Sequence, residues 1–211
     1  FKARWGGLEQ AGPLGFAVNL FAGLIVFNMF SECVNRAPGL VVANPNYVKK
    51  VVFPLEILGC VAVGNAGFHA LTSLLILFVF ELIAFQHLPL TLLWLPLIWL
   101  PLILGSLACT WFLSAAGVFL RDIGQLMSVG LNILMFLSPI FFPISAMPAK
   151  WQPLLQLNPL AQVIEQTRRV AVQGVNPGWE YIAFGTLMTL AACELSFRGF
   201  QKSKKAFADV L

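Results

Sequence analysis

Few side chains in this sequence could carry out acid–base chemistry, and they lie far apart. Of the two histidines, His69 lies within a long apolar stretch and His87 in a short polar turn. We expect His69 to bond a neighbouring helix rather than to transfer protons, and His87 to be solvated. Glu81 and Glu194 lie near the ends of apolar stretches, where they can reach a polar boundary. No paired carboxylates occur, so the sequence indicates no proton relay of its own.

The motifs of common enzyme and metal sites are absent from the sequence. It contains no GxxxxGK[ST] or GxG segment that would cradle phosphate groups, and no GxSxG or HExxH. The four cysteines are scattered, without CxxC or Cys/His spacing, so we expect neither a disulfide framework nor a zinc site. If this chain moves a substrate uphill, the energy must come from another subunit.

The longest moderately polar interruption in the first two thirds of the chain is Ser31–Pro54, which reads SECVNRAPGLVVANPNYVKKVVFP. Strongly apolar stretches flank it on both sides. Hydrocarbon cannot hold such a segment, because each unpaired polar group there is energetically expensive. We therefore predict a loop or a short surface helix outside a lipid bilayer.

The composition places the chain in the membrane class. Of its 211 residues, 59% are hydrophobic and 10% are charged, and the mean hydropathy is +0.84. Soluble domains carry about 25% charged residues, so this chain has less than half of that share. The net charge of +4 could suggest nucleic acid in a soluble protein. Membrane topology explains it better here, and we expect no nucleic-acid partner.

The spacing of charged residues predicts five transmembrane helices. Four charge-free stretches are long enough, since a span needs about 20 apolar residues, and a shorter fifth lies near the C-terminus. The expected helices run at about Leu14–Phe30, Leu55–Ile83, Leu93–Leu120, Ile123–Phe142 and Glu180–Phe197. Five prolines interrupt the apolar segment 143–178, which favours two short re-entrant helices there. The predicted fold is an all-α integral membrane protein with a single transmembrane domain over residues 1–211.

Basic residues set the expected orientation, because they concentrate on the cytoplasmic side. With Ser31–Pro54 in the cytoplasm, that side holds eight basic residues and the other side holds five. The eight are Arg36, Lys49, Lys50, Arg121, Arg198, Lys202, Lys204 and Lys205, and the five are Lys2, Arg4, Lys150, Arg168 and Arg169. We predict an external N-terminal end and a cytoplasmic C-terminus. An external start without a signal sequence predicts one more span before residue 1.

Several stretches resemble the membrane subunits of type-2 ATP-binding-cassette exporters of bacterial polysaccharides, including lipopolysaccharide O-antigen. The resemblance begins with ECVNRAPGLVVANPNYVKKVVFPLEIL at Glu32–Leu58. It continues with VFLRDIGQL at Val118–Leu126, LSPIFFPISAMP at Leu137–Pro148 and LNPL at Leu157–Leu160. The motifs occur in the family's order, and the resemblance runs through nearly all 211 residues.

The resemblance implies a particular assembly. Members have six membrane helices and a cytoplasmic amphipathic N-terminal helix, and this chain lacks that helix and the first span. Members form homodimers in the bacterial cytoplasmic (inner) membrane, with two copies of a separate ATPase subunit that binds ATP and Mg. The chain itself would be a transport subunit, not an enzyme, with no cofactor or metal. Its cargo among the membrane lipids would be an undecaprenyl-linked polysaccharide.

The resemblance also assigns roles to segments of the chain. Residues 31–54 would be the cytoplasmic coupling loop, which docks in a groove of the ATPase. Its representative positions are Asn35, Arg36, Pro38, Asn44, Pro45 and Lys49. The pair Arg121 and Asp122 would lie at the second cytoplasmic turn, and a local ion pair fixing a helix end explains it equally well.

An external re-entrant gate would be formed by residues 139–178. Aromatic rings suit a glycan path, because sugar C–H faces lie flat on them. The candidates are Phe136, Phe141, Phe142 and Trp151. Each phenylalanine also fits an ordinary lipid-facing or packed position.

Other functions stay open on the sequence alone. The same family could export capsule, teichoic acid, a drug, a lipid or haem. A membrane enzyme acting on polyprenyl-linked sugars would need acidic or basic groups at the interface, where this sequence has only scattered ones. A proton-coupled carrier is disfavoured because Glu81 and Glu194 lack a mid-membrane partner in the sequence.

Overall fold

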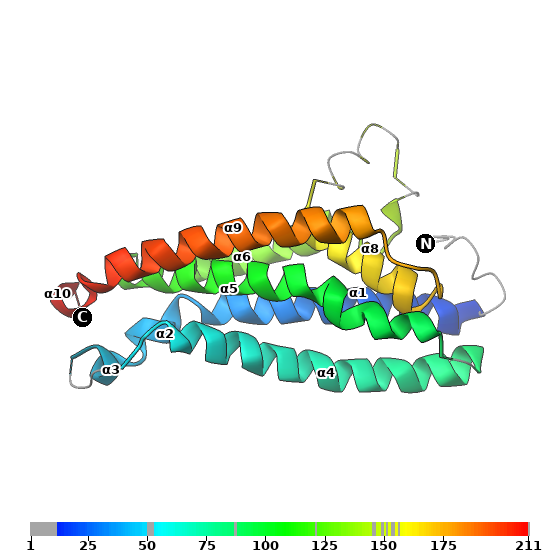
Figure 1. Ribbon diagram of the computed structural model, residues 1–211, viewed down its shortest axis with the longest axis horizontal. Helices are drawn as coiled ribbons and strands as arrows, with labels where there is room; N and C mark the ends of the chain where they lie inside the picture. Colours follow the sequence, from blue (N-terminus) through cyan, green and yellow to red (C-terminus); the bar gives the residue numbers. More distant parts are fainter. Residues whose placement is uncertain are drawn as a thin grey trace.

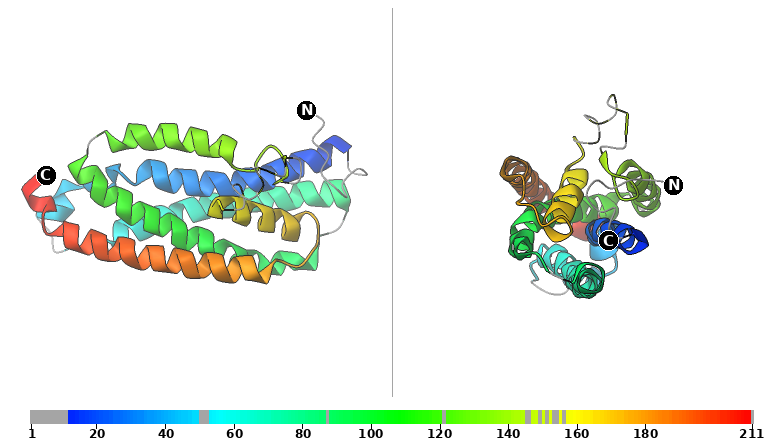
Figure 2. Two further views of the ribbon diagram at one scale, coloured as in Figure 1. Left: turned by 90° about the horizontal axis from the view of Figure 1, so that it is seen from above. Right: turned by 90° about the vertical axis from the view of Figure 1, so that its right-hand side faces the viewer.

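The protein is an elongated bundle of helices that run alternately in opposite directions along one axis (Figures 1 and 2). A computed structural model describes residues 12–49, 53–86, 88–120, 122–144, 147–148, 150, 152, 155 and 157–210. The long helices are α1 (Gly12–Arg36), α4 (Ile57–Phe85), α5 (Leu95–Phe119), α6 (Ile123–Leu137) and α9 (Trp179–Lys204). The short ones are α2 (Gly39–Val42), α3 (Pro45–Lys49), the 3-10 helix η2 (Leu90–Trp94), α8 (Pro159–Ala171) and α10 (Phe207–Val210).

Membrane-spanning capacity differs between the long helices. Within the described residues, the stretches Leu14–Arg36, Ile57–Phe85 and Leu90–Phe119 are long and apolar enough to cross a bilayer. Helix α6 is apolar but has 15 residues, and α9 carries basic residues in its last turn. The prediction of an all-helical multi-pass membrane protein is confirmed. The count of five spans stays a prediction.

The boundary of the predicted loop 31–54 was wrong at its start. Helix α1 continues through Ser31 and ends at Arg36. Its last turns carry side-chain bonds four residues apart, from Arg36 Nη1 to Glu32 Oε1 at 3.1 Å and from Asn35 Nδ2 to Ser31 Oγ at 3.4 Å. Such pairs stabilise a helix surface, so a polar composition did not end this helix.

Prolines shape the rest of the loop into short helices. Pro38 stands immediately before α2, and Pro45 is the first residue of α3. Proline suits a first helical turn, because its fixed φ is already helical and its missing N–H would be unpaired there. We refer to residues 37–49, which contain both short helices, as the elbow. Short surface helices were one of the two forms predicted for this segment.

A proline also shortens the fourth long helix. Helix α6 ends at Leu137, five residues before the predicted end at Phe142, because Ser138 precedes Pro139 and adopts an extended backbone with ψ 146°. A residue before proline disfavours helical geometry. The 139–178 segment then begins as irregular chain.

One of the two predicted re-entrant helices is clearly defined. Helix α8 has 13 residues, starts at Pro159 and is capped by Asn158, whose side chain accepts a bond from the Leu160 backbone N–H at 3.0 Å. Gln152 and Leu155 are also helical, but their neighbours lie outside the described residues. The second short helix therefore stays a prediction.

Helix α1 contributes one wall of the main apolar core. It packs against α4, α5, α6 and α8. Its buried apolar residues include Val18, Ala22, Val26 and Cys33. Most residues of α8 are buried, as the re-entrant prediction requires, and its entry into one leaflet stays a prediction.

Candidate functional site

The predicted coupling residues lie together at one end of the bundle, beside α10 and the C-terminus (Figure 1). Asn35 and Arg36 form the exposed last turn of α1, and Asn44 and Pro45 join α2 to α3. Lys49 is the last residue of α3, and its side chain lies outside the described part of the structure. Pro38 differs from the others because it is buried.

The contact that buries Pro38 joins the elbow to α5. A Cβ added to Gly117 would lie 2.8 Å from Pro38 Cα and C, so only glycine permits this approach. A Cβ on Gly124 would lie 4.0 Å from Pro38 Cβ. These glycines flank the turn between α5 and α6, so the elbow rests on that turn.

The structure therefore brings together two segments that the sequence singled out separately. The α5–α6 turn contains Arg121 and Asp122, the pair predicted at the second cytoplasmic turn. Asp122 is exposed just before α6 and makes no side-chain capping bond to that helix. Arg121 lies outside the described residues, so the suggested local ion pair stays a prediction.

Apolar packing fixes the inner side of the elbow. Val41 of α2, with 1% exposure, belongs to a buried cluster with residues of α5, α9 and α10. The other members of this cluster are Leu55, Ala108, Trp111, Ala115, Val118, Cys193, Phe200 and Phe207. The elbow is thus in direct apolar contact with α5 and with the end of α9.

A polar cluster beside the elbow joins the start of α4 to α9. Glu56 accepts bonds from Lys204 Nζ and Gln201 Nε2, both at 3.0 Å, and its backbone carbonyl accepts from Trp111 Nε1 at 2.9 Å. Although partial burial disfavours the charged form, the bonds from its own backbone N–H, Lys204 and Gln201 lower the pKa of Glu56. Sequence reasoning missed this cluster, because no local pattern links Glu56 to partners 145 and 148 residues away.

The predicted aromatic positions lie at the other end of α6. The rings of Phe136 and Phe141 stack, with centroids 6.1 Å apart and planes inclined by 28°. Both are exposed, at 67% and 37% respectively, and Phe142 is half-buried. Trp151 lies outside the described residues. The structure thus places two of the four predicted rings side by side on an accessible face.

Of the ionisable residues singled out in the sequence, His69 and Glu194 have charged partners and Glu81 is buried without one. His69 Nδ1 lies 2.9 Å from Glu32 Oε2, so its predicted bond to a neighbouring helix is confirmed. Glu81 was expected to reach the interface, but it is 1% exposed and neither carboxylate oxygen has a hydrogen-bond partner. Glu194 forms an ion pair with Arg198 at 2.7 Å.

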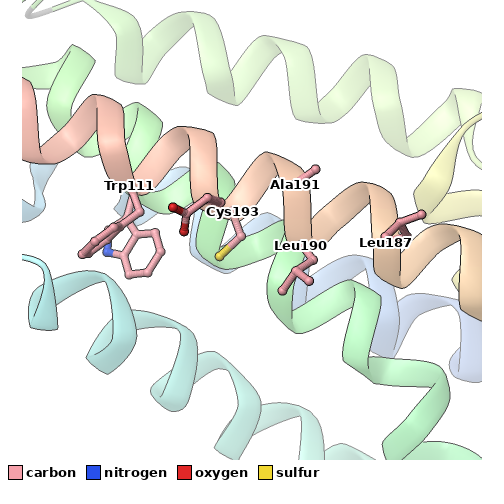
Figure 3. Close-up of a pocket in the computed structure, with 7 residues that line it drawn as sticks. Trp111, Leu187, Leu190, Ala191 and Cys193 are labelled. Carbon is pink, nitrogen blue, oxygen red and sulfur yellow. The ribbon is translucent and has the colours of Figure 1, made fainter.

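An apolar cavity of about 580 Å³ opens between α5 and α9 (Figure 3). Its lining consists of Trp111, Leu187, Leu190, Ala191, Cys193, Glu194 and Phe197. The lining is mostly apolar, and Glu194 and Cys193 are its only ionisable side chains. Among the described residues, no group of three or more His, Cys, Asp or Glu side chains could hold a metal ion.

These observations define a multi-pass helical membrane protein whose elbow is packed onto the bundle. The sequence matches the family model of ABC-2 type transporters over residues 2–171. The chain belongs to the ABC-2 type transporter family, and it is a transmembrane subunit of such a transporter. Membrane subunits of this family work with ATPase subunits, which bind the ATP.

Two curated relatives cover most of the chain. The O-antigen export system permease protein RfbA of Klebsiella pneumoniae is 25% identical over 201 residues, which is 93% of this chain and 76% of that protein. The polysialic acid transport protein KpsM of Escherichia coli is 31% identical over 190 residues, which is 84% of this chain and 70% of that protein.

Proposed function

We propose that this chain is the channel-forming subunit of an ATP-driven exporter that moves undecaprenyl-linked polysaccharide, O-antigen, across the bacterial cytoplasmic membrane. The similarity to RfbA over 93% of the chain supports the cargo class. The observation that carries the mechanism is the seat of the elbow on α5, where Pro38 meets Gly117 without an intervening side chain.

In this proposal the elbow is the coupling element. Two copies of the chain pair in the membrane, and each elbow docks in a groove of one of two ATPase subunits in the cytoplasm. Asn35, Arg36, Asn44, Pro45 and Lys49 face the ATPase, while Pro38 faces the bundle. When ATP brings the ATPases together, each elbow is pushed and tilts the α5–α6 turn. The seam between the two copies then opens for the glycan.

The gate region (residues 139–178) lies on the external side in this arrangement, and the C-terminus lies in the cytoplasm beside the elbow. The exposed pair Phe136 and Phe141 offers flat apolar faces to sugar rings. Phe142 and Trp151 are the other two positions predicted for this path. The bundle contributes the route and the ATPases contribute the energy.

Capsular polysaccharide is the second candidate cargo. The identity to KpsM, at 31%, is higher than the 25% to RfbA, although the match covers less of the chain. The two cargoes differ in the glycan that fails to reach the cell surface when the gene is deleted.

The test is a deletion strain complemented with variants of the gene. We expect the deletion to leave lipid-linked glycan inside the cells and the wild-type gene to restore export. Arg36→Ala should fail to restore export and should release the ATPase subunit during co-purification. Arg198→Ala is the matched control, because Arg198 is also exposed and also pairs with a glutamate four residues earlier. Unchanged export and ATPase binding in Arg36→Ala would remove the coupling role, and normal export without the gene would overturn the function.

A further inference from the structure

Arg168 of α8 is a basic side chain that the transport route above does not use. It has 0% exposure, although arginine is among the residues least often buried. Its Nε donates to the Asn19 carbonyl at 2.9 Å, and its Nη2 donates to the Ile140 carbonyl at 2.6 Å. Its Nη1 donates to the carbonyl of Pro139. One guanidinium group that belongs to α8 therefore binds the backbone of α1 and the backbone of the turn after α6.

The face of α1 that meets Arg168 leaves space for the guanidinium group. A Cβ added to Gly23 would lie 2.5 Å from Arg168 Nη2 and 3.2 Å from Cζ. Gly23 lies four residues after Asn19, so both belong to the same face of α1. The missing side chain at Gly23 is the space into which the guanidinium fits. We call Arg168, Gly23 and the three carbonyls the arginine junction.

The chemistry of the arginine junction favours a fixed geometry. Burying a charge is expensive unless it is paired or well bonded, and guanidinium presents its donors in a rigid planar fork. Backbone carbonyls cannot rotate away as side chains do. Sliding of α8 along α1 would break the charge-assisted bond to the Asn19 carbonyl and pull the guanidinium out of the space at Gly23, so the two helices are expected to move together.

Helix α1 connects this junction with the elbow. From Asn19 to Arg36 it is continuous, and this distance corresponds to about 26 Å at 1.5 Å per residue. The elbow begins at the next residue. A single stiff element thus reaches from the segment that the ATPase is proposed to push to the carbonyl that Arg168 holds.

We propose that Arg168 is a positioning residue that fastens the gate region to α1, so that displacement of the elbow carries α8 with it. This inference rests on the proposed function, since it assumes that the elbow is moved by an ATPase. It gives the external gate a mechanical connection to the cytoplasmic side within one subunit.

The test places one spin label in the elbow and one in the chain just before α8. In a protein whose four native cysteines are replaced by alanine, Asn46→Cys reports on the elbow and Leu157→Cys reports on the chain before α8. Both native side chains are exposed, and Leu157 has 79% exposure. The labelled transporter is purified with its ATPase subunit in lipid vesicles, and spectra are recorded with and without ATP.

We expect both labels to respond to ATP when Arg168 is present. With Arg168→Gln, the response at Asn46→Cys should persist and the response at Leu157→Cys should disappear. An unchanged response at Leu157→Cys in that variant would overturn the arginine junction alone. No response at Asn46→Cys in the otherwise native protein would overturn the proposed function and this inference with it.

A second pair of variants covers the case in which Arg168→Gln does not fold. Gly23→Ala should lower export at least tenfold, because its Cβ meets the guanidinium. Arg168→Lys lacks the Nη2 atom that the new Cβ would touch. Gly23→Ala combined with Arg168→Lys should therefore export as well as Arg168→Lys alone. Gly64→Ala is the control, because a Cβ there meets nothing within 4 Å. Additive losses in the double variant would contradict the fit of Arg168 into Gly23.

Discussion

The elbow and the gate region lie at opposite ends of the bundle and are held by different kinds of contact (Figure 1). The elbow is held by shape, through the approach of Pro38 to Gly117 and the apolar packing of Val41. Its side-chain hydrogen bonds among the described residues are local, as in Asn44 to the Leu40 carbonyl at 2.9 Å. A piece held in this way can tilt without breaking directional bonds.

The gate region is packed into the main apolar core through residues such as Leu160 and Ile164, and it also makes directional hydrogen bonds to other elements. Besides the arginine junction, Trp99 Nε1 of α5 donates to Thr167 Oγ1 at 3.2 Å, and Thr91 Oγ1 donates to the Val170 carbonyl at 2.7 Å. Hydrogen bonds weaken steeply with misalignment. This end is therefore expected to keep one arrangement or switch to another, while the elbow moves gradually.

The largest expected effect is the loss of Arg168. Arg168→Met would leave the carbonyls of Asn19, Pro139 and Ile140 without this buried donor, and a buried acceptor left unsatisfied costs about 1–3 kcal/mol. We expect a clear fall in the thermal unfolding temperature of the detergent-purified protein. Arg169→Met is the matched control and should cost less, because Arg169 is only half-buried and its Nε has no hydrogen-bond partner. An equal fall in unfolding temperature for Arg168→Met and Arg169→Met would mean that the hydrogen bonds of Arg168 do not stabilise the gate region.

The elbow should be sensitive to shape rather than to polarity. Gly117→Ala places a Cβ against the backbone of Pro38, which cannot move aside as a flexible side chain would, and overpacking of this kind costs about 1–3 kcal/mol. Gly130→Ala lies in α6 with nothing within 4 Å of the new Cβ, and alanine is the better helix former. We expect thermal unfolding to show destabilisation for Gly117→Ala and a neutral or stabilising change for Gly130→Ala. A neutral Gly117→Ala would mean that the elbow is not seated on α5.

A single hydrogen bond of the gate region should have a measurable effect. Trp99→Phe keeps the aromatic packing but removes the donor to Thr167, and a net loss of about 1 kcal/mol is typical. A double-mutant cycle with Thr167→Val measures the coupling between the two side chains. Trp94→Phe is the control, since Trp94 is 41% exposed. A coupling energy of zero in the cycle would contradict the hydrogen bond.

The smallest effect is expected for the polar cluster beside the elbow. The pKa of Glu56 is lowered in the folded protein, so its stabilising contribution is present above its unfolded-state pKa of about 4.5. That contribution is lost as pH falls through the folded pKa, and it should stay below about 1 kcal/mol for this partly exposed pair. Unfolding temperatures between pH 7 and pH 3 should converge for the native protein and Glu56→Gln at the acidic end. A constant difference in unfolding temperature between the two proteins over that range would mean that the charge of Glu56 does not stabilise the fold.

The sequence was sufficient for the features that depend on local composition. Charge-free stretches predicted the long helices, and prolines predicted the breaks at the elbow and after α6. The ends of α1 and α6 were misplaced by about one and a half turns, because polar residues can pair along a helix and proline disfavours helical geometry in the residue before it. Local rules place helices but not their last turns.

The arginine junction could not have been predicted in this way. In the sequence Arg168 is one more basic residue of the external side, and its partner Asn19 lies 149 residues away. Its partners are backbone carbonyls, which every residue carries, so no residue type marks them. The glycine that makes room for it is equally inconspicuous among 17 glycines. Burial of a charged side chain is a property of the packed bundle, not of its local sequence.

The central claim is that the elbow faces the cytoplasm and is gripped there by an ATPase subunit. The most direct measurement is labelling of Asn46→Cys, in the cysteine-free protein, with a membrane-impermeant maleimide. We predict no labelling in intact cells, labelling after the cytoplasmic membrane is opened, and protection when the ATPase subunit is bound. Labelling of Asn46→Cys in intact cells would place the elbow outside and contradict the account.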